Sequence, residues 1–277
     1  MIGRLAFKRD SPEVKHICAQ DGAFRRLVDL VGDVEVPRRS PDVFEALVRS
    51  IVGQQLSGKA AAAIWARIQA LCGGGPHGQE FAALRTDSEV AGLEVAGPEV
   101  AGLVTSTDCA SGDGSAPGDC SALVDESTAP STAPQTKAIV TPSRLSAFHD
   151  DTLRAAGLSR PKVTYVRDLC RKVQSGEIDP DGVRALSDDD LVATLTQVKG
   201  IGEWTCQMLM IFSLGRMDVF APADLVLRKG VQWLYGLEEV PRVRELLTIS
   251  ERWKPYRTIA SLYLWEVANL PSGRPKV

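Results

Sequence analysis

The chain has 277 residues, 44% of them hydrophobic, and a net charge of −3, so it can bury the core of one large domain or two small ones. No apolar run approaches the roughly 18 residues of a membrane span, and residues 1–10 lack the apolar centre of a secretory signal. These features exclude a membrane partner and predict an intracellular protein, in the nucleus of a eukaryote or the cytoplasm and nucleoid of a prokaryote.

Helical patterns begin after a mixed N-terminal segment, residues 1–20, which we leave unassigned. Apolar residues recur at helical spacing over residues 23–31, and a glycine follows them. Ser40 and Pro41 then predict the start of a second helix, with Ser40 as its N-cap and Pro41 at its first position.

Two adjacent glutamines, Gln54 and Gln55, interrupt that second helix directly after Gly53. Ser57 can cap a third helix that runs to residue 71. Exposed amides in turns usually contact only solvent. The alternative is that these polar side chains extend from the turn to contact a ligand. The residues alone leave both interpretations open.

Residues 73–136 differ from the rest of the chain in charge and in composition. They carry ten acidic residues and one basic residue, a net charge of −9, which leaves +6 on the remainder. Three copies of Glu-Val-Ala-Gly precede a stretch dominated by Ser, Thr, Ala, Gly, Asp and Pro. Such a segment cannot bury enough surface to offset its ordering entropy, so we expect a disordered acidic insertion. The basic remainder can still bind phosphates.

Helical patterns resume after the insertion. Residues 145–156 predict one helix, and Ser159 can cap another that stops at Gly176. No convincing alternation of apolar and polar residues occurs in the chain, so we predict an all-α fold. Its ordered domain is expected to comprise residues 21–72 and 137–277.

A glycine-containing hairpin follows. Ser187 and Asp190 fit a capping box for a helix that runs towards Lys199, where the residues 200–202 (Gly-Ile-Gly) break it. A second helix follows and ends at Gly215. Two glycines let the backbone approach a ligand closely, and the N–H groups at the start of the second helix favour an anion. A plain turn between two helices is the alternative.

Asp224 stands where the next helix begins, and the last helix is expected over residues 255–269. On position alone, Asp224 is an N-cap residue.

Taken together, these patterns resemble the helix-hairpin-helix DNA glycosylases, in their 3-methyladenine DNA glycosylase II branch. The matching stretches are residues 44–57, 158–162, 198–205, 215–225 and 252–265. The resemblance implies two helical subdomains with a cleft for DNA and the target base between them. It also implies an enzyme that flips a damaged base out of duplex DNA and hydrolyses its bond to the sugar.

The resemblance assigns the catalytic role to Asp224. A carboxylate beside the sugar stabilises the positive charge that develops there as the base leaves. Asp218 lies in the same motif and is expected to be structural.

Trp204 occupies the place where the lyase branch of this superfamily carries its lysine nucleophile. Tryptophan cannot form a Schiff base, which favours a monofunctional enzyme that uses water and leaves an abasic site. Its indole suits a base pocket, because stacking on a positively charged alkylated base is favourable. Core packing at the start of a buried helix is the alternative for this residue.

The resemblance also implies DNA contacts away from the target base. Gln55 matches the position that fills the gap left by the flipped base. A DNA phosphate is expected at the hairpin, together with a loosely held sodium or potassium ion on the hairpin backbone. The hairpin residues are Lys199, Gly200, Ile201, Gly202 and Thr205.

No other cofactor is expected. The six cysteines are scattered without a Cys-x-x-Cys pair, and none follows Cys206. This pattern excludes both a structural zinc site and the C-terminal iron–sulfur cluster of some relatives.

The sequence thus predicts a monomeric, monofunctional glycosylase, an N-glycosyl hydrolase that removes alkylated purines such as 3-methyladenine from double-stranded DNA. Two alternatives remain. One is a non-catalytic DNA-binding module that uses the hairpin only to hold phosphates, and the other is a bifunctional glycosylase and lyase.

Overall fold

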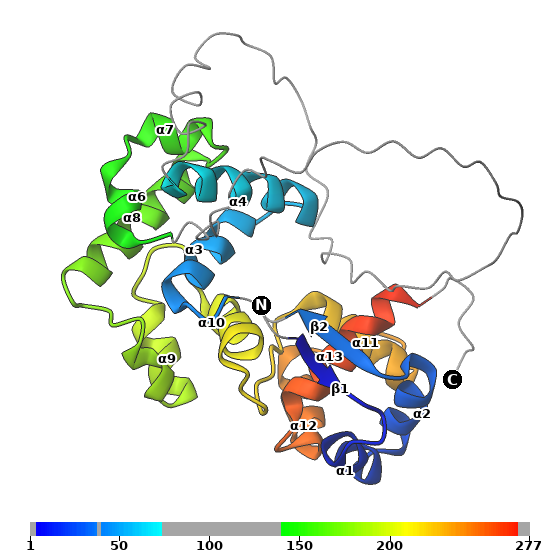
Figure 1. Ribbon diagram of the computed structural model, residues 1–277. Helices are drawn as coiled ribbons and strands as arrows, with labels where there is room; N and C mark the ends of the chain where they lie inside the picture. The colour runs from blue at the N-terminus through cyan, green and yellow to red at the C-terminus, as the bar shows by residue number, and fades with distance from the viewer. Residues whose placement is uncertain (1–3, 38–39, 74–139, 271–277) are drawn as a thin grey trace, which may run out of the picture.

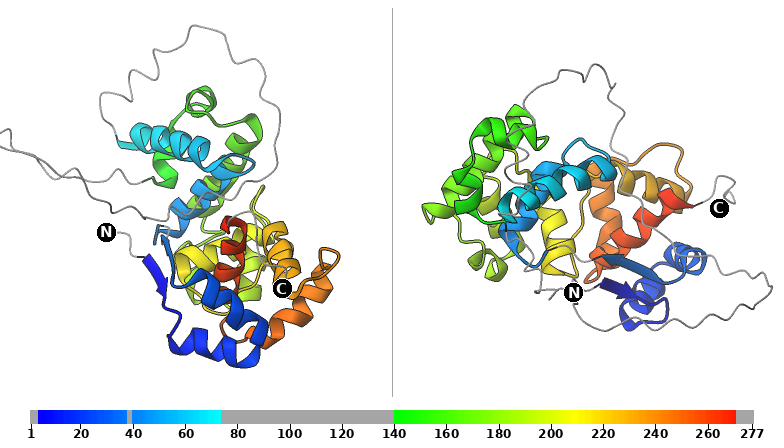
Figure 2. Two further views of the ribbon diagram at one scale, coloured as in Figure 1. Left: turned by 90° about the vertical axis from the view of Figure 1, so that its right-hand side faces the viewer. Right: turned by 45° about the horizontal axis from the view of Figure 1, so that its top comes forward.

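The computed structural model describes residues 4–37, 40–73 and 140–270. These residues form two lobes, which Figure 1 shows from the front and Figure 2 from two further directions. The expected acidic insertion falls almost entirely on residues 74–139 and so lies outside the described residues. Within the described part, no helix is both long and apolar enough to cross a membrane.

We call residues 40–73 and 140–214 the hairpin lobe. Helix α3 packs on α4, α8 and α10, while α6 and α7 pack on α8. The elements of this lobe are α3 (Val43–Gly53), α4 (Gly58–Gly73), α6 (Pro142–Ala147), α7 (Asp150–Ala155), α8 (Arg160–Gln174), η1 (Gly182–Ala185), α9 (Asp188–Leu195), α10 (Glu203–Leu209) and the π-helix η2 (Met210–Leu214).

We call residues 4–37 and 225–270 the terminal lobe, because it joins both ends of the described chain (blue and orange to red in Figure 1). Helices α2 and α13 pack on one another and on α11. The elements are β1 (Arg4–Phe7), α1 (Pro12–Gln20), α2 (Gly22–Val31), β2 (Val34–Pro37), α11 (Leu225–Tyr235), α12 (Val243–Ser250), η3 (Glu251–Trp253), α13 (Arg257–Glu266) and η4 (Val267–Asn269).

The all-helical prediction is confirmed except for one small sheet. Strands β1 and β2 pair antiparallel, with Arg4 opposite Pro37 and Phe7 opposite Val34. Each strand has four residues, which is too short for an alternating pattern to stand out in the sequence. The unassigned N-terminal segment therefore contributes β1 and α1, and the buried side chains of Val14 and Ile17 on α1 join the core.

Two predicted helix boundaries were wrong. Helix α3 is capped by Asp42 and not by Ser40, because the Asp42 carboxylate accepts the Glu45 N–H at 2.8 Å. The helix expected over residues 145–156 is two short helices, α6 and α7. The Arg167 guanidinium binds the carbonyls of Leu145 and Ser146 at 3.1 Å each, which stabilises the early end of α6.

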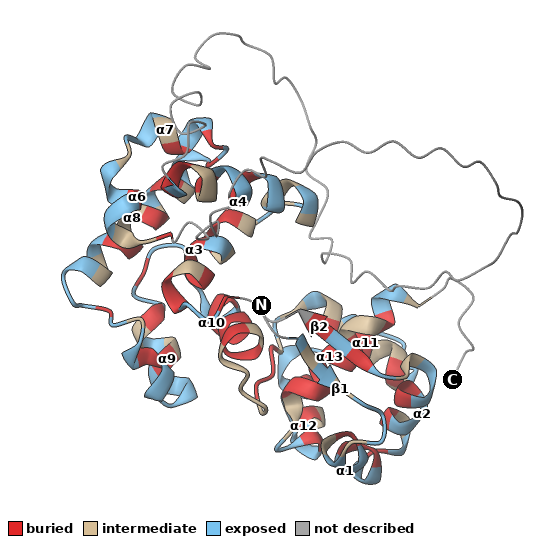
Figure 3. Ribbon diagram, viewed as in Figure 1, coloured by how far each residue is buried: buried red, intermediate tan, exposed pale blue. Residues whose placement is uncertain are grey.

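Buried residues occur in both lobes, as the colouring of Figure 3 shows. In the terminal lobe, Trp253 and Tyr263 pack against Phe24 with ring centroids 5.8 and 5.7 Å apart. Asp21 is a carboxylate buried in this region, and its Oδ2 accepts the indole N–H of Trp253 at 3.0 Å. Aromatic packing and a satisfied buried carboxylate thus join α2 to the C-terminal helices.

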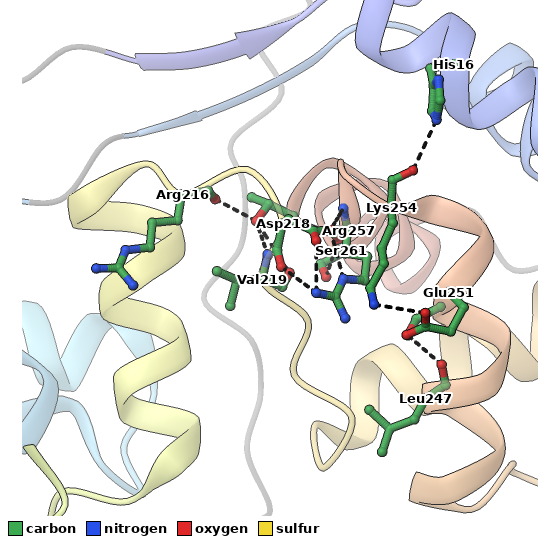
Figure 4. Close-up of polar contacts among 11 residues, drawn as sticks. His16, Arg216, Asp218, Val219, Leu247, Glu251, Lys254, Arg257 and Ser261 are labelled. Carbon is green, nitrogen blue, oxygen red and sulfur yellow. Dashed lines mark hydrogen bonds and ion pairs between the residues drawn. The ribbon is translucent and has the colours of Figure 1, made fainter. Parts of the chain in front are cut away.

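Residues 215–224 cross between the lobes and are tied to each of them. The Arg216 guanidinium donates to the Leu186 carbonyl in the hairpin lobe at 2.6 Å. Asp218 pairs with Arg257 of the terminal lobe through two bonds of 2.8 and 2.9 Å, as Figure 4 shows. Thr258 adds a bond from its backbone N–H to the Met217 carbonyl at 3.0 Å. Asp218 therefore has the structural role that the sequence predicted.

Candidate active site

Asp224 stands at the end of this crossing segment, as the N-cap of α11. Its Oδ1 accepts the backbone N–H groups of Val226 and Leu227 at 2.8 and 2.9 Å. The carboxylate is half-buried. The capping interpretation of Asp224 is therefore correct, and the cap uses only one of the two carboxylate oxygens.

Two tryptophans from opposite lobes reach the same carboxylate. The Trp204 indole N–H, from α10 in the hairpin lobe, donates to Asp224 Oδ2 at 2.8 Å. The Trp265 indole N–H, from α13 in the terminal lobe, lies 3.4 Å from Oδ1. Indole N–H groups from both lobes thus orient the Asp224 carboxylate where the two lobes meet.

The aromatic surfaces around Asp224 are partly open to solvent. Trp204 is 45% exposed, so core packing does not explain its place in the chain. Leu225, directly after Asp224, is 46% exposed. Trp265 stacks on Phe212 with ring centroids 5.7 Å apart and an interplanar angle of 26°. Exposed aromatic and aliphatic faces beside a carboxylate suit a flat, cationic ligand.

The glycine hairpin lies between α9 and α10 in the same lobe as Trp204. Gly200 has φ +80°, and a β-carbon there would lie 2.2 Å from the Tyr165 ring. Ile201 is buried and anchors the turn, whereas a β-carbon on Gly202 would meet no atom within 4 Å. Gly202 is the N-cap of α10 and has no side-chain cap. The hairpin backbone is therefore open on the Gly202 side and packed on the Gly200 side.

The other two predicted hairpin residues have backbone partners within the protein. The Lys199 N–H donates to Asp168 Oδ2 at 2.9 Å. Thr205 is 5% exposed, and its N–H donates to the Gly202 carbonyl at 3.0 Å. The exposed Lys199 side chain and the backbone around Gly202 are the parts of this hairpin that face outward.

Gln55 occupies the turn between α3 and α4, where its side chain is exposed. Its φ of 57° is the one positive value at a non-glycine residue in the described part of the chain. The preceding Gln54 is bonded to the hairpin, because its Nε2 donates to the Gly200 carbonyl at 2.7 Å. The structure thus connects the predicted gap-filling turn to the predicted phosphate-binding hairpin.

Trp265 and Lys162 contact the site residues although the sequence analysis gave them no role, whereas Gln54 was considered there as a polar residue beside a ligand. Trp265 and Lys162 lay at the ends of two matching stretches, which was the one available signal. Their contacts span 41 and about 110 positions of the chain, so local patterns do not reveal them.

Candidate nucleophiles and metal ligands near the hairpin are limited. Burial raises the pKa of the Cys206 thiol on α10 to about 11, so this cysteine is a neutral thiol at physiological pH. Among the described residues, no three His, Cys, Asp or Glu side chains are grouped as metal ligands. Carbonyl oxygens suit the predicted sodium or potassium ion, but the Gly200 carbonyl already accepts the Gln54 amide. That ion stays a prediction.

Several known proteins resemble this chain in sequence and in fold. Residues 122–255 match the family model described as "HhH-GPD superfamily base excision DNA repair protein". A DNA-3-methyladenine glycosidase from Bacillus halodurans, known from a crystal structure, is 33% identical. The alignment covers 95% of this chain and 92% of that one, with a TM-score of 0.66. The chain belongs to the HhH-GPD superfamily.

Two further comparisons are with Schizosaccharomyces pombe. DNA-3-methyladenine glycosylase 1 of Schizosaccharomyces pombe is 29% identical over 92% of this chain and 86% of its own length. A solved structure of the 3-methyladenine DNA glycosylase from that organism, in complex with abasic DNA, has a TM-score of 0.64 at 27% identity. It covers 94% of this chain and 98% of the other. The recognition of this superfamily from sequence motifs is thereby confirmed.

Proposed function

We propose that this chain is a DNA-3-methyladenine glycosylase that acts as a monofunctional enzyme on duplex DNA containing alkylated purines. The observation that carries the proposal is the Asp224 carboxylate, oriented by the Trp204 indole N–H at 2.8 Å and flanked by exposed apolar surface. The names of the relatives support the same class of substrate.

The first step is the extraction of the damaged nucleotide from the base stack. The hairpin around Gly202 would hold a phosphate through backbone N–H groups, and the exposed Lys199 side chain would add a positive charge. Gln55 would occupy the space that the flipped base vacates. A single copy of the chain supplies all of these groups.

The second step is breakage of the bond between the sugar C1′ and the base nitrogen. A 3-methylated adenine carries a positive charge in the nucleotide, so it departs with the bonding electrons as a neutral base. The positive charge then resides on the sugar, where the Asp224 carboxylate stabilises it. The indole of Trp204 provides a face on which the cationic base can stack before it leaves.

Water completes the reaction. Its oxygen bonds to C1′ of the sugar and it releases one proton to the solvent, which leaves an abasic site and an unbroken DNA strand. The residue two places after the second hairpin glycine is Trp204, and an indole cannot form the Schiff base that strand cleavage by a lyase needs.

The test uses duplexes that each contain one 3-methyladenine or one hypoxanthine, incubated with the wild type and with Asp224→Asn. We expect free base and intact abasic strands from the wild type, and at least about a hundredfold slower release from Asp224→Asn. Equal release by both proteins would refute the role of Asp224. Binding without release by the wild type would instead favour the non-catalytic module, and a borohydride-trapped adduct would favour the lyase.

A further inference from the structure

One face of α8 contacts both of the loops that we assign to DNA. Lys162, Tyr165 and Asp168 are spaced three residues apart and so lie along the same side of the helix. Lys162 reaches the turn that carries Gln55, whereas Tyr165 and Asp168 reach the glycine hairpin. None of the roles proposed above for the reaction uses this face.

Lys162 closes the C-terminal end of α3. Its ammonium group donates to the Val52 carbonyl at 2.9 Å and to the Gln54 carbonyl at 2.6 Å. The last carbonyls of a helix lack partners within the helix, and its C-terminal end favours a positive charge. Burial lowers the pKa of Lys162, so holding the charge there has a cost that these bonds offset. The ammonium group thus fixes the backbone directly before Gln55.

The backbone at Gln55 needs such support. Its φ of 57° lies in the left-handed region, which costs about 1–2 kcal/mol for a residue with a β-carbon. Conformations of this kind persist where the surroundings hold them, and they cluster at functional sites. Here the support comes from Lys162 on one side and from the bond between Gln54 Nε2 and the Gly200 carbonyl on the other.

The same helix fixes the hairpin. The Tyr165 ring covers Gly200 so closely that no β-carbon would fit, and Asp168 Oδ2 accepts the Lys199 N–H at 2.9 Å. Asp168 is itself paired with Arg171 at 3.4 Å, and its side chain is 12% exposed. Two loops that are about 145 positions apart in sequence are therefore attached to one rigid element, with a direct bond between them.

We propose that this face of α8 is a bracket that holds the Gln55 turn and the glycine hairpin in one fixed relation, with Lys162 as the positioning residue for Gln55. This inference rests on the proposed function, because it places Gln55 in the gap left by the flipped base. A phosphate held at the hairpin then sets where Gln55 enters the duplex. Binding of the phosphate at the hairpin would therefore also position Gln55 for insertion into the gap.

A double-mutant cycle in DNA binding tests the bracket without requiring catalysis. The dissociation constant for a duplex containing a tetrahydrofuran abasic-site analogue is measured for the wild type, Gln55→Ala, Lys162→Met and the double variant. We expect each single variant to bind about tenfold more weakly, equivalent to ~1.4 kcal/mol. The double variant should also be about tenfold weaker, because Lys162 acts through Gln55.

Matched variants separate positioning from general stability. Lys172→Met removes a lysine from the same helix whose Nζ pairs with Glu177 at 3.3 Å, and it should bind as the wild type does. Lys162→Arg keeps donors for the two carbonyls and should recover most of the affinity. If Lys162→Met does not fold, Gln54→Ala takes its place in the cycle, since it breaks the bond to Gly200 and keeps the lysine.

Three outcomes would overturn the inference: unchanged binding by Lys162→Met, unchanged binding by Gln55→Ala, or a double variant about a hundredfold weaker, as independent effects would give. Release of 3-methyladenine by the wild type is measured in parallel. If the double variant binds no more weakly than the single variants but the wild type releases no base, the bracket is supported and the proposed enzyme is refuted. If the wild type releases base but the effects of the two substitutions add, the enzyme is supported and the bracket is refuted.

Discussion

Helices α10 and α11 differ in how the N–H groups at their first turns are treated: α10 has no side-chain cap, and α11 is capped by a carboxylate. Both helices present backbone N–H groups and the positive end of a helix dipole. At α10 the N-cap is Gly202, which has no side-chain cap and is open to the outside. At α11 the N-cap is Asp224, whose Oδ1 accepts the N–H groups of Val226 and Leu227. One helix start is uncapped and would suit an anion from outside, and the other is filled by the protein's own carboxylate.

This difference shows how two roles are separated within about twenty residues of sequence. The uncapped start can accept a phosphate of any nucleotide, which suits holding a strand without regard to sequence. The capped start fixes one carboxylate in place, so that its second oxygen faces Trp204 in a defined direction. Trp204 belongs to the first helix and donates to the carboxylate that caps the second, which connects the two helix starts.

Gly200 and Gly202 should respond very differently to alanine. Gly200→Ala places a β-carbon 2.2 Å from the Tyr165 ring at φ +80°, so we expect the free energy of unfolding to fall by about 2–4 kcal/mol. Gly202→Ala has no neighbour within 4 Å and should cost about 1 kcal/mol or less. Urea unfolding measures both.

The control for this pair is binding to duplex DNA. Gly202→Ala should stay folded and yet bind more weakly, because its methyl group would stand where we propose that the phosphate approaches. Equal losses of stability for the two variants would contradict the assignment of one packed side and one open side to the hairpin.

Trp204→Phe removes the indole N–H and keeps an aromatic face. A hydrogen bond to a charged group contributes about 1.5–3 kcal/mol, and partial exposure reduces this, so we expect base release to slow about tenfold. Because Trp204 is 45% exposed, the melting temperature should change little. Single-turnover excision measures the rate, and a rate equal to that of the wild type would show that Asp224 needs no orientation from Trp204.

Asp224→Ala and Asp224→Asn separate the capping role from the charge. Both variants should lose base release, since neither has a carboxylate. Asparagine keeps an oxygen that can accept the Val226 and Leu227 N–H groups, whereas alanine does not, so Asp224→Ala should be less stable by about 1 kcal/mol. Thermal denaturation of the two variants compares them directly, and equal stability would mean that the cap contributes nothing.

The local parts of this fold were predictable from sequence because their signals lie within a few residues. Ser187 caps α9 and accepts the Asp190 N–H, and Gly215 ends the helical run at φ 72°, both as predicted. Asp224 likewise caps α11, as its position in the sequence predicts. The cap of α3 was wrong because two polar residues, Ser40 and Asp42, stood close enough to compete for the role.

The relations between distant segments were not predictable from such patterns. The break between α6 and α7 depends on Arg167, about twenty positions further along the chain. The bonds of Lys162 and Gln54 depend on how three helices meet, which no periodicity records. Family motifs placed Asp224 and Trp204 on the list of site residues, but the bond between them is a property of the folded chain.

The terminal lobe is built from both ends of the described chain, and this affects how the protein folds during synthesis. Its core joins Phe24 to Tyr263, and the Tyr263 hydroxyl donates to the Gly32 carbonyl across 231 positions. The helices of the hairpin lobe, residues 40–73 and 140–214, in contrast pack mainly on one another. A ribosome releases the chain from its N-terminal end, so the hairpin lobe can fold while synthesis continues, and α1 and α2 must wait for α13. The terminal lobe, whose first helices emerge before the rest of the fold, is therefore expected to fold last. The surroundings of Asp224 are complete only when the two ends of the described chain have packed together.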